Sequence, residues 1–217
     1  MWTKICGFTD EETARFAVDA GADAIGINFY PKSARSTDVT MARNIVAAVG
    51  DDSLCVGLFV NEPFDDLVTK VKESGVQAIQ LHGDEPPHFL VALAVALPDH
   101  SIIKAFAVDH VGLHMVDQYL GRCRALGRMP WACLLDAKVI GQRGGTGQVA
   151  PWEIIEEQYR EDWPPLLLAG GLHIDNVADA VNRVEPWGID IASGAERERA
   201  VKDPRMMSEL LAVTKKL

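Results

Sequence analysis

Eight short apolar segments, separated by stretches with helical spacing, constrain what this chain can fold into. They are rich in branched and aromatic side chains and cover 2–6, 24–28, 54–60, 76–81, 101–106, 131–136, 165–170 and 188–193. Their average spacing of about 27 residues is the length of one strand, one helix and two short loops. This alternation predicts a parallel sheet covered by helices.

The intervening stretches carry helix signals at both ends. In 10–21, Asp10 suits the N-cap, Gly21 suits the position after the last turn, and alanine and valine side chains between them share one face. The same arrangement recurs in 63–75 and 173–184. These stretches predict amphipathic helices that each cover the neighbouring strands.

Eight strand–helix units in succession, with no flexible linker or charge block between them, favour a single-domain (β/α)8 barrel over residues 1–217. The main alternative is an open, doubly wound sheet. A GxGxxG motif after the first strand would favour that alternative, but 4–12 contains a single glycine. A closed barrel places its active site at the C-terminal ends of the strands.

The charge balance limits the classes of partner. With 21 Lys and Arg against 31 Asp and Glu, the formal net charge of -10 disfavours nucleic acids and anionic membranes. The longest apolar run, 89–97, is too short to span a bilayer, and no basic, apolar leader precedes the first strand. We therefore expect a cytoplasmic protein, either a monomer or a homodimer, that uses local donors to hold any anionic substrate.

The four cysteines show neither CxxC spacing nor a paired histidine pattern. This predicts no metal site and no disulfide framework, and it suits a reducing compartment. Three of them are expected to be small buried apolar residues, as most free cysteines are.

Cys6 differs because it ends the first strand beside a glycine turn and a helix start. Lys4 leaves the same face one step lower, so its ammonium and the helix N-terminus should lower the thiol pKa towards neutrality. Asp136 ends the sixth strand, where burial should raise its pKa. These two groups should face each other across the barrel mouth and could act as base and acid. The alternatives are a buried apolar Cys6 and an Asp136 that caps a loop or pairs with Lys138.

Glycine-containing loops follow the last three strands. Small residues let backbone N–H groups approach a phosphate, which in barrels usually binds after strands seven and eight. The candidate phosphate-binding residues are Gly144, Gly145, Gly170, Gly171, Ser193 and Gly194.

Two further side chains could take part in substrate binding or catalysis at the barrel mouth. Arg35, in the loop after the second strand, could bind a substrate carboxylate in bidentate fashion, although most arginines are simply solvated. His82 follows the fourth strand and could support acid–base chemistry, although a local hydrogen-bonding role is the commoner one.

Several segments together resemble phosphoribosylanthranilate isomerase. They keep the family's order along nearly the whole chain, and they are KICG at 4–7, GADAIGINFYPKSAR at 21–35, GLFVNE at 57–62, QLHGDE at 80–85, LLDA at 134–137, GGTG at 144–147, AGGL at 169–172 and GIDIASGAE at 188–196. The resemblance implies a (β/α)8 barrel that needs no cofactor. It implies the Amadori rearrangement of N-(5-phosphoribosyl)anthranilate to 1-(2-carboxyphenylamino)-1-deoxyribulose 5-phosphate in tryptophan biosynthesis.

The resemblance also implies roles for individual residues. Cys6 would be the general base, Asp136 the general acid and Arg35 the ligand of the anthranilate carboxylate, with the glycine-rich loops on the phosphate. The sequence departs from the family's usual pattern at Ala34 and Ser36, which should loosen the arginine loop. It departs again at Ala192, which replaces a frequent serine.

Other functions remain open from the residues alone. Another phosphosugar barrel enzyme, such as an epimerase, an aldolase or a relative of indole-glycerol-phosphate synthase, would use the same phosphate loops. An aldolase would need a Schiff-base lysine at a strand end, for which Lys104 is the nearest candidate. A barrel that binds a phosphate ligand without catalysis is the third possibility.

Overall fold

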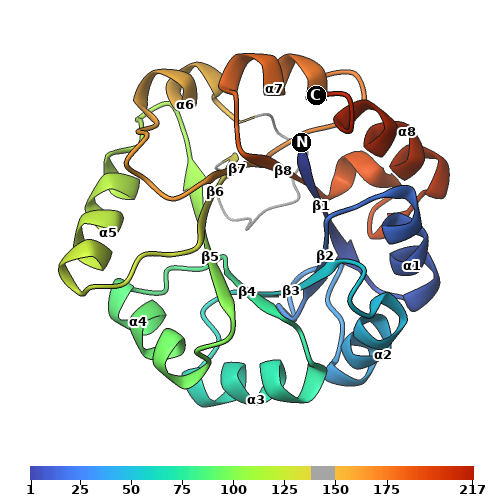
Figure 1. Cartoon of the computed structure of the whole chain (residues 1–217), viewed down its shortest axis with the longest axis horizontal. Helices are drawn as coiled ribbons and strands as arrows, with labels where there is room; N and C mark the ends of the chain where they lie inside the picture. Colours follow the sequence, from blue (N-terminus) through green and yellow to red (C-terminus); the bar gives the residue numbers. More distant parts are fainter. Residues whose placement is uncertain (138–149) are drawn as a thin grey trace.

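The computed structural model describes residues 1–137 and 150–217. Eight parallel strands form a closed barrel in the order β1 to β8, and helices surround it as an outer ring (Figure 1). The barrel closes where Trp2 and Lys4 of β1 lie in register with Gly188 and Asp190 of β8. The predicted (β/α)8 barrel is therefore confirmed, and the open sheet is wrong because no strand is left as an edge in the ring.

The strands and helices alternate along the whole chain. The barrel strands are β1 Trp2–Phe8, β2 Ala24–Asn28, β3 Leu54–Phe59, β4 Ala78–Leu81, β5 Ser101–Val108, β6 Ala132–Ala137, β7 Leu166–Leu168 and β8 Gly188–Ile191. The helices are α1 Glu11–Ala20, α2 Val39–Val49, α3 Phe64–Ser74, α4 Pro87–Ala96, α5 His114–Ala125, α6 Trp152–Gln158, α7 Val177–Val184 and α8 Pro204–Thr214. A short 3₁₀ turn, Ser193–Ala195, and a small hairpin of β9 Glu196–Glu198 and β10 Val201–Lys202 follow β8.

The helix ends follow the local chemistry of the sequence. The Asp10 side chain accepts a hydrogen bond from the Thr13 backbone N–H at 2.8 Å, which satisfies a free donor at the start of α1. Gly21 then ends the helix in the left-handed conformation, with φ of 103°. Gly75 ends α3 in the same way, as the sequence predicts.

The last two barrel strands are shorter than their apolar runs suggest. The predicted strand 165–170 is reduced to Leu166–Leu168 because the chain turns at Gly170, whose φ is 89°. The run 188–193 gives a strand only to Ile191, after which the 3₁₀ turn begins at Ser193. Both strand ends therefore become loops that lie at the barrel mouth.

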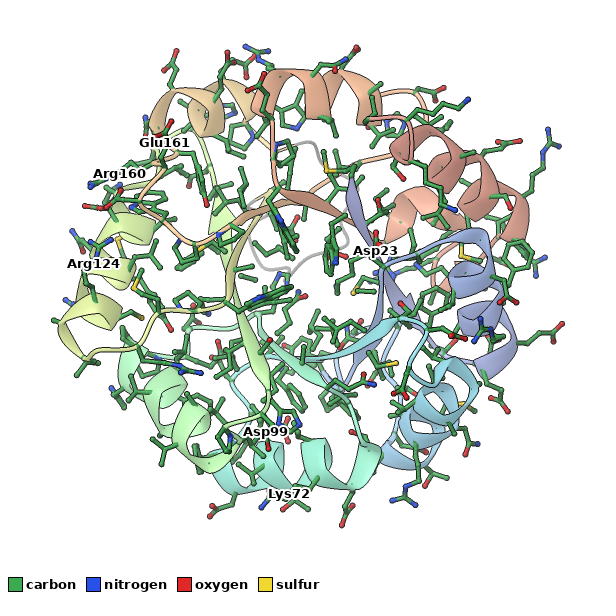
Figure 2. The ribbon with its side chains drawn as sticks, viewed as in Figure 1. Asp23, Lys72, Asp99, Arg124, Arg160 and Glu161 are labelled. Carbon is green, nitrogen blue, oxygen red and sulfur yellow. The ribbon has the colours of Figure 1, made fainter. Side chains whose placement is uncertain are left out.

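Two apolar layers hold the barrel together. Inside the ring, mostly small and branched side chains from six strands pack on one another, including Val56, Ala78, Ala105 and Leu134. A larger cluster fills the space between the strands and the helices. This layering leaves charged side chains such as Arg124 and Arg160 on the outside of the ring (Figure 2).

Three tryptophans close the N-terminal end of the barrel. Trp2 stacks on Trp187 with ring centroids 5.0 Å apart, and Trp131 packs edge-on against both rings. Trp131 and Trp187 immediately precede β6 and β8, so all three lie at the starts of strands. The polar groups of the barrel interior lie nearer the opposite end.

In the described part of the chain, no helix has the length and apolar character needed to cross a bilayer.

Candidate active site

A small cavity of about 60 Å³ lies at the C-terminal ends of the strands. Cys6, Arg35, His82, Asp136 and the loops after β7 and β8 contribute to its wall. The sequence placed these residues at strand ends far apart in the chain. The closed barrel brings them to one mouth.

Cys6 is buried near the end of β1, two positions before the strand ends at Phe8, and its sulfur lies over Gly26 of the neighbouring strand. A Cβ atom at Gly26 would lie 2.5 Å from the Cys6 sulfur, so only glycine leaves room for the thiol in this position. Cys6 and Gly26 are register partners, which fixes the sulfur at the rim of β1 and β2.

The direction of the Cys6 pKa differs from the sequence prediction. Burial raises the pKa of the Cys6 thiol, and the opposing charges of Lys4 and Lys202 do not overcome this effect. The neighbouring carboxylate of Asp190 raises the pKa further. The α1 N-terminus gives no compensation because it starts only at Glu11 and is capped by the carboxylate of Asp10. The prediction of a near-neutral thiol pKa in the free protein is therefore wrong.

Lys4 and Asp190 form a buried ion pair inside the barrel. The Lys4 Nζ donates to the Asp190 Oδ1 at 2.9 Å, and the lysine is completely buried. Burial alone would lower the pKa of Lys4, but the charge of Asp190, together with hydrogen bonds to Asp190 and Cys6, outweighs burial and the pKa is raised. A permanent ammonium therefore lies directly below the thiol.

Asp136 is the penultimate residue of β6, and it lines the same cavity as Cys6. Its Oδ2 lies 3.5 Å from the Nε2 of His82, and both side chains are about nine-tenths buried. The amide nitrogen of Gln80 lies 2.9 Å from the other ring nitrogen, Nδ1. When Gln80 donates to Nδ1, the ring proton sits on Nε2 and faces Asp136. His82 is thus a neighbour of Asp136.

Arg35 is buried and already has a protein partner. Its Nε and Nη2 donate to the two carboxylate oxygens of Glu196 at 2.6 and 2.8 Å. The hydrogen bonds with Glu196 raise the pKa of Arg35, although burial opposes them. The guanidinium therefore approaches the mouth from a fixed position.

The loop that carries Arg35 is well braced. Asn28 Nδ2 and the Arg35 backbone N–H both donate to the Ser33 hydroxyl at 3.1 Å, and Ser36 forms a β-bridge with Asn28. The Ser36 N–H also donates to the Ser33 carbonyl. Serine hydroxyl and backbone groups therefore hold the loop around Ala34 and Ser36, and the loosening expected from these two residues stays a prediction.

The glycines after β7 and β8 allow the loops to pack closely on one another. A Cβ at Gly170 would lie 2.7 Å from the backbone nitrogen of Ala137, and one at Gly194 would lie 2.0 Å from the carbonyl oxygen of Leu172. Gly170 and Gly171 also have positive φ values of 89° and 64°. Gly170, Gly171, Ser193 and Gly194 line the cavity or adjoin it, whereas Gly144 and Gly145 lie outside the described residues.

A larger cleft of about 980 Å³ adjoins the mouth over the ends of β4 and β5, and His82 lines both spaces. Lys104 lies in its wall, but it projects outward from the barrel because its two neighbours in β5 face the interior. Its Nζ donates to the Gly83 carbonyl at 2.7 Å and to Glu85 Oε2 at 2.9 Å. Lys104 is therefore a structural cation beneath the β4 loop and does not offer a Schiff-base lysine at the mouth.

Four polar residues of this region escaped the sequence analysis: Gln80, Asp190, Glu196 and Lys202. Asp190 could have been found, because an acid in an apolar strand that pairs with the first strand lies level with Lys4. Glu196 and Lys202 meet through the β9–β10 hairpin, for which the sequence has no period-two apolar pattern. Among residues 1–137 and 150–217, no three His, Cys, Asp or Glu side chains are grouped so as to hold a metal ion.

The chain is similar to proteins of one family over almost its whole length. Residues 3–213 match the family model for N-(5′-phosphoribosyl)anthranilate isomerase. The N-(5′-phosphoribosyl)anthranilate isomerase of Geotalea daltonii is 37% identical over 211 residues, which cover 96% of this chain and 93% of the relative.

Solved structures agree with the sequence relatives. The phosphoribosyl anthranilate isomerase of Thermotoga maritima superposes with a TM-score of 0.85 at 33% identity, covering 99% of this chain and 98% of the other. A phosphoribosyl anthranilate isomerase in complex with reduced 1-(o-carboxyphenylamino)-1-deoxyribulose 5-phosphate has a TM-score of 0.82 at 31% identity, covering 99% and 98%.

Proposed function

The chain belongs to the N-(5′-phosphoribosyl)anthranilate isomerase family, and from that premise we propose how its own side chains carry out the reaction. It is an aldose–ketose isomerase of tryptophan biosynthesis that converts N-(5-phosphoribosyl)anthranilate to 1-(2-carboxyphenylamino)-1-deoxyribulose 5-phosphate. The observation that carries the proposed mechanism is that Cys6 and Asp136, from strands β1 and β6, line one cavity.

Asp136 is the general acid in this proposal. In its protonated form it donates to the furanose ring oxygen, and the C1′–O bond breaks to give an open-chain iminium. His82, whose Nε2 lies 3.5 Å from Oδ2, supports the carboxyl group.

Cys6 is the general base. Its thiolate removes the C2′ proton of the iminium, and the electron pair forms the C1′–C2′ double bond of an enolamine that tautomerises to the ketose. Burial raises the pKa of the thiol, so the thiolate depends on the nearby cations of Lys4 and Lys202. Each placed proton transfer accelerates the reaction by about 10² to 10⁴-fold.

The two ends of the substrate are held apart. Arg35 binds the anthranilate carboxylate, and the glycine loops after β7 and β8, together with Gly144 and Gly145, take the phosphate. Anchoring both ends orients the sugar between acid and base, which lowers the entropy cost of the reaction.

Two conservative variants test the assignment. Cys6→Ser and Asp136→Asn should fold and should bind the reduced product analogue, but each should lose at least about 10²-fold in kcat. The assay follows fresh phosphoribosylanthranilate by its fluorescence, and thermal melting checks folding. Near-normal turnover in Cys6→Ser would remove the base from the mechanism.

The partners follow from the chemistry of the substrate. The ligand is a small phosphosugar. A related structure, 32% identical, is of monomers generated from the dimeric phosphoribosylanthranilate isomerase of Thermotoga maritima. For this chain we propose one domain over residues 1–217, a monomer or homodimer, a cytoplasmic location and no nucleic-acid partner. Sedimentation of the purified protein distinguishes the two oligomeric states.

A further inference from the structure

A buried cluster of three charged side chains lies behind the mouth, between the β2 loop and the β9–β10 hairpin. Glu196 is at its centre and accepts hydrogen bonds from Arg35 through both carboxylate oxygens. Lys202 Nζ donates to Glu196 Oε1 at 2.9 Å and to the Ala192 carbonyl at 2.8 Å, and the Ala200 N–H donates to Oε2 at 3.1 Å. None of the three charged side chains is more than 9% exposed.

The arginine is fixed sterically as well as by charge. A Cβ at Gly7 would lie 2.4 Å from the Arg35 Cδ, so the side chain lies directly across the backbone that follows Cys6. Gly7 has a φ of 93°, where β1 shifts register against β2. The guanidinium thus has a packed stem on one side and a bidentate carboxylate on the other.

The cluster keeps one surplus positive charge, because it has two cations and one carboxylate. Burial alone would raise the pKa of Glu196, but the hydrogen bonds from Arg35 and the charge of Lys202 outweigh burial, and the pKa is lowered. Glu196 therefore stays ionised near neutral pH. Its pairing uses the Nε–Nη2 edge of the guanidinium and leaves Nη1 for another acceptor.

We propose that Glu196 is a positioning residue for substrate recognition, which holds Arg35 so that the Nη1 end of its guanidinium meets the substrate carboxylate. Lys202 pairs with the same Glu196 carboxylate, so the cluster of two cations and one carboxylate keeps a net positive charge for the substrate carboxylate. This inference rests on the proposed role of Arg35 in binding the anthranilate carboxylate.

The proposal differs measurably from a purely structural tie between the two loops. A structural tie would affect the binding of every ligand at the mouth. A positioning residue affects only ligands that carry the carboxylate, because the phosphate loops and the acid–base pair do not depend on the direction of the guanidinium.

The test measures the affinity of two ligands by calorimetry. One is reduced 1-(o-carboxyphenylamino)-1-deoxyribulose 5-phosphate, and the other is its phenylamino counterpart without the carboxylate. Glu196→Asp keeps the charge but withdraws the carboxylate by one methylene, and it should weaken the first ligand about ten-fold or more while leaving the second unchanged. Glu198→Asp is the matched control, since Glu198 lies on the same strand with its side chain 70% exposed.

A second variant guards against a folding defect. Glu196→Gln keeps the side-chain length and leaves Lys202 on the Ala192 carbonyl, but it removes the carboxylate that accepts from both Nε and Nη2 of Arg35, and it should show the same selective loss. Equal weakening of both ligands, or no weakening of either, overturns the proposal.

Arg35→Lys separates this inference from the proposed function. If Arg35→Lys discriminates between the ligands and the Glu196 variants do not, Arg35 keeps its role and the positioning role of Glu196 is refuted. If Arg35→Lys weakens both ligands equally or neither, both assignments are refuted.

Discussion

Replacing Gly26 by alanine should displace the thiol of Cys6, the proposed general base, without removing it. The new Cβ would lie 2.5 Å from the Cys6 sulfur and 2.9 Å from the Cys6 Cα, whereas ordinary van der Waals contact begins near 3.4 Å. The thiol must therefore move by about 0.9 Å, or the two strands must separate. A misplacement of about 1 Å costs on the order of 10²-fold in rate, so kcat should fall by about that factor.

The same substitution has a predictable cost in stability. Overpacking of this kind costs about 1 to 3 kcal/mol, which for a chain of this length lowers Tm by about 2 to 4 °C per kcal/mol. The affinity for the reduced product analogue should stay close to wild type, because neither anchoring end involves the sulfur.

Gly121→Ala is the matched control for this experiment. Gly121 lies within α5 with no atom within 4 Å of an added Cβ, so alanine should leave kcat unchanged and stabilise the helix by about 0.5 to 1 kcal/mol. A Gly26→Ala protein that melts cooperatively and keeps wild-type kcat would refute the claim that catalysis requires the Cys6 sulfur to lie in the space above Gly26.

Three further perturbations examine the buried polar groups. Burial raises the pKa of Cys55 to about 12 and that of Cys123 to about 11 from the ordinary value of 9.0, so above about pH 9 the unfolded chain binds fewer protons than the folded one. The free energy of unfolding in urea should therefore fall between about pH 9 and pH 11, less steeply in Cys55→Ala, and a flat profile would contradict this. Lys104→Met leaves the buried carboxylate of Glu85 without its lysine, so the free energy of unfolding in urea should fall by about 3 to 5 kcal/mol while the folded protein keeps its kcat. A lower kcat at unchanged stability would show that Lys104 takes part in the reaction. Lys4→Met should destabilise the protein by a similar amount. The double variant Lys4→Met with Asp190→Leu should recover stability but not kcat, since the Cys6 thiolate still lacks the Lys4 ammonium. Recovery of both stability and kcat would show that the Lys4–Asp190 pair is purely structural.

The periodicity of the sequence was sufficient to predict the barrel, because all eight barrel strands are marked by apolar runs and several of the helical stretches between them carry signals at both ends. Asp10 and Gly21 mark the two ends of α1 by backbone chemistry that needs no tertiary partner. The strand boundaries were less accurate where a glycine turns the chain inside an apolar run, as at Gly170.

The site was predictable only in part. Strand ends identify Cys6 and Asp136, but the direction of the Cys6 pKa depends on how deeply the thiol is buried and on Asp190, which is 184 positions away in the chain. The partner of Arg35 could not be predicted either, since Glu196 reaches it through a hairpin of only a few residues. Pairings of this kind are properties of three-dimensional packing and leave no periodic pattern.

The stacked indoles at the start of the strands make one end of the molecule visible to fluorescence while the reaction takes place at the other. Three of the five tryptophans lie in that floor. Their emission therefore reports whether the base of the cylinder is intact in variants altered at the rim. A variant altered at the C-terminal ends of the strands that has an unchanged tryptophan spectrum and no turnover has lost catalysis while keeping its fold.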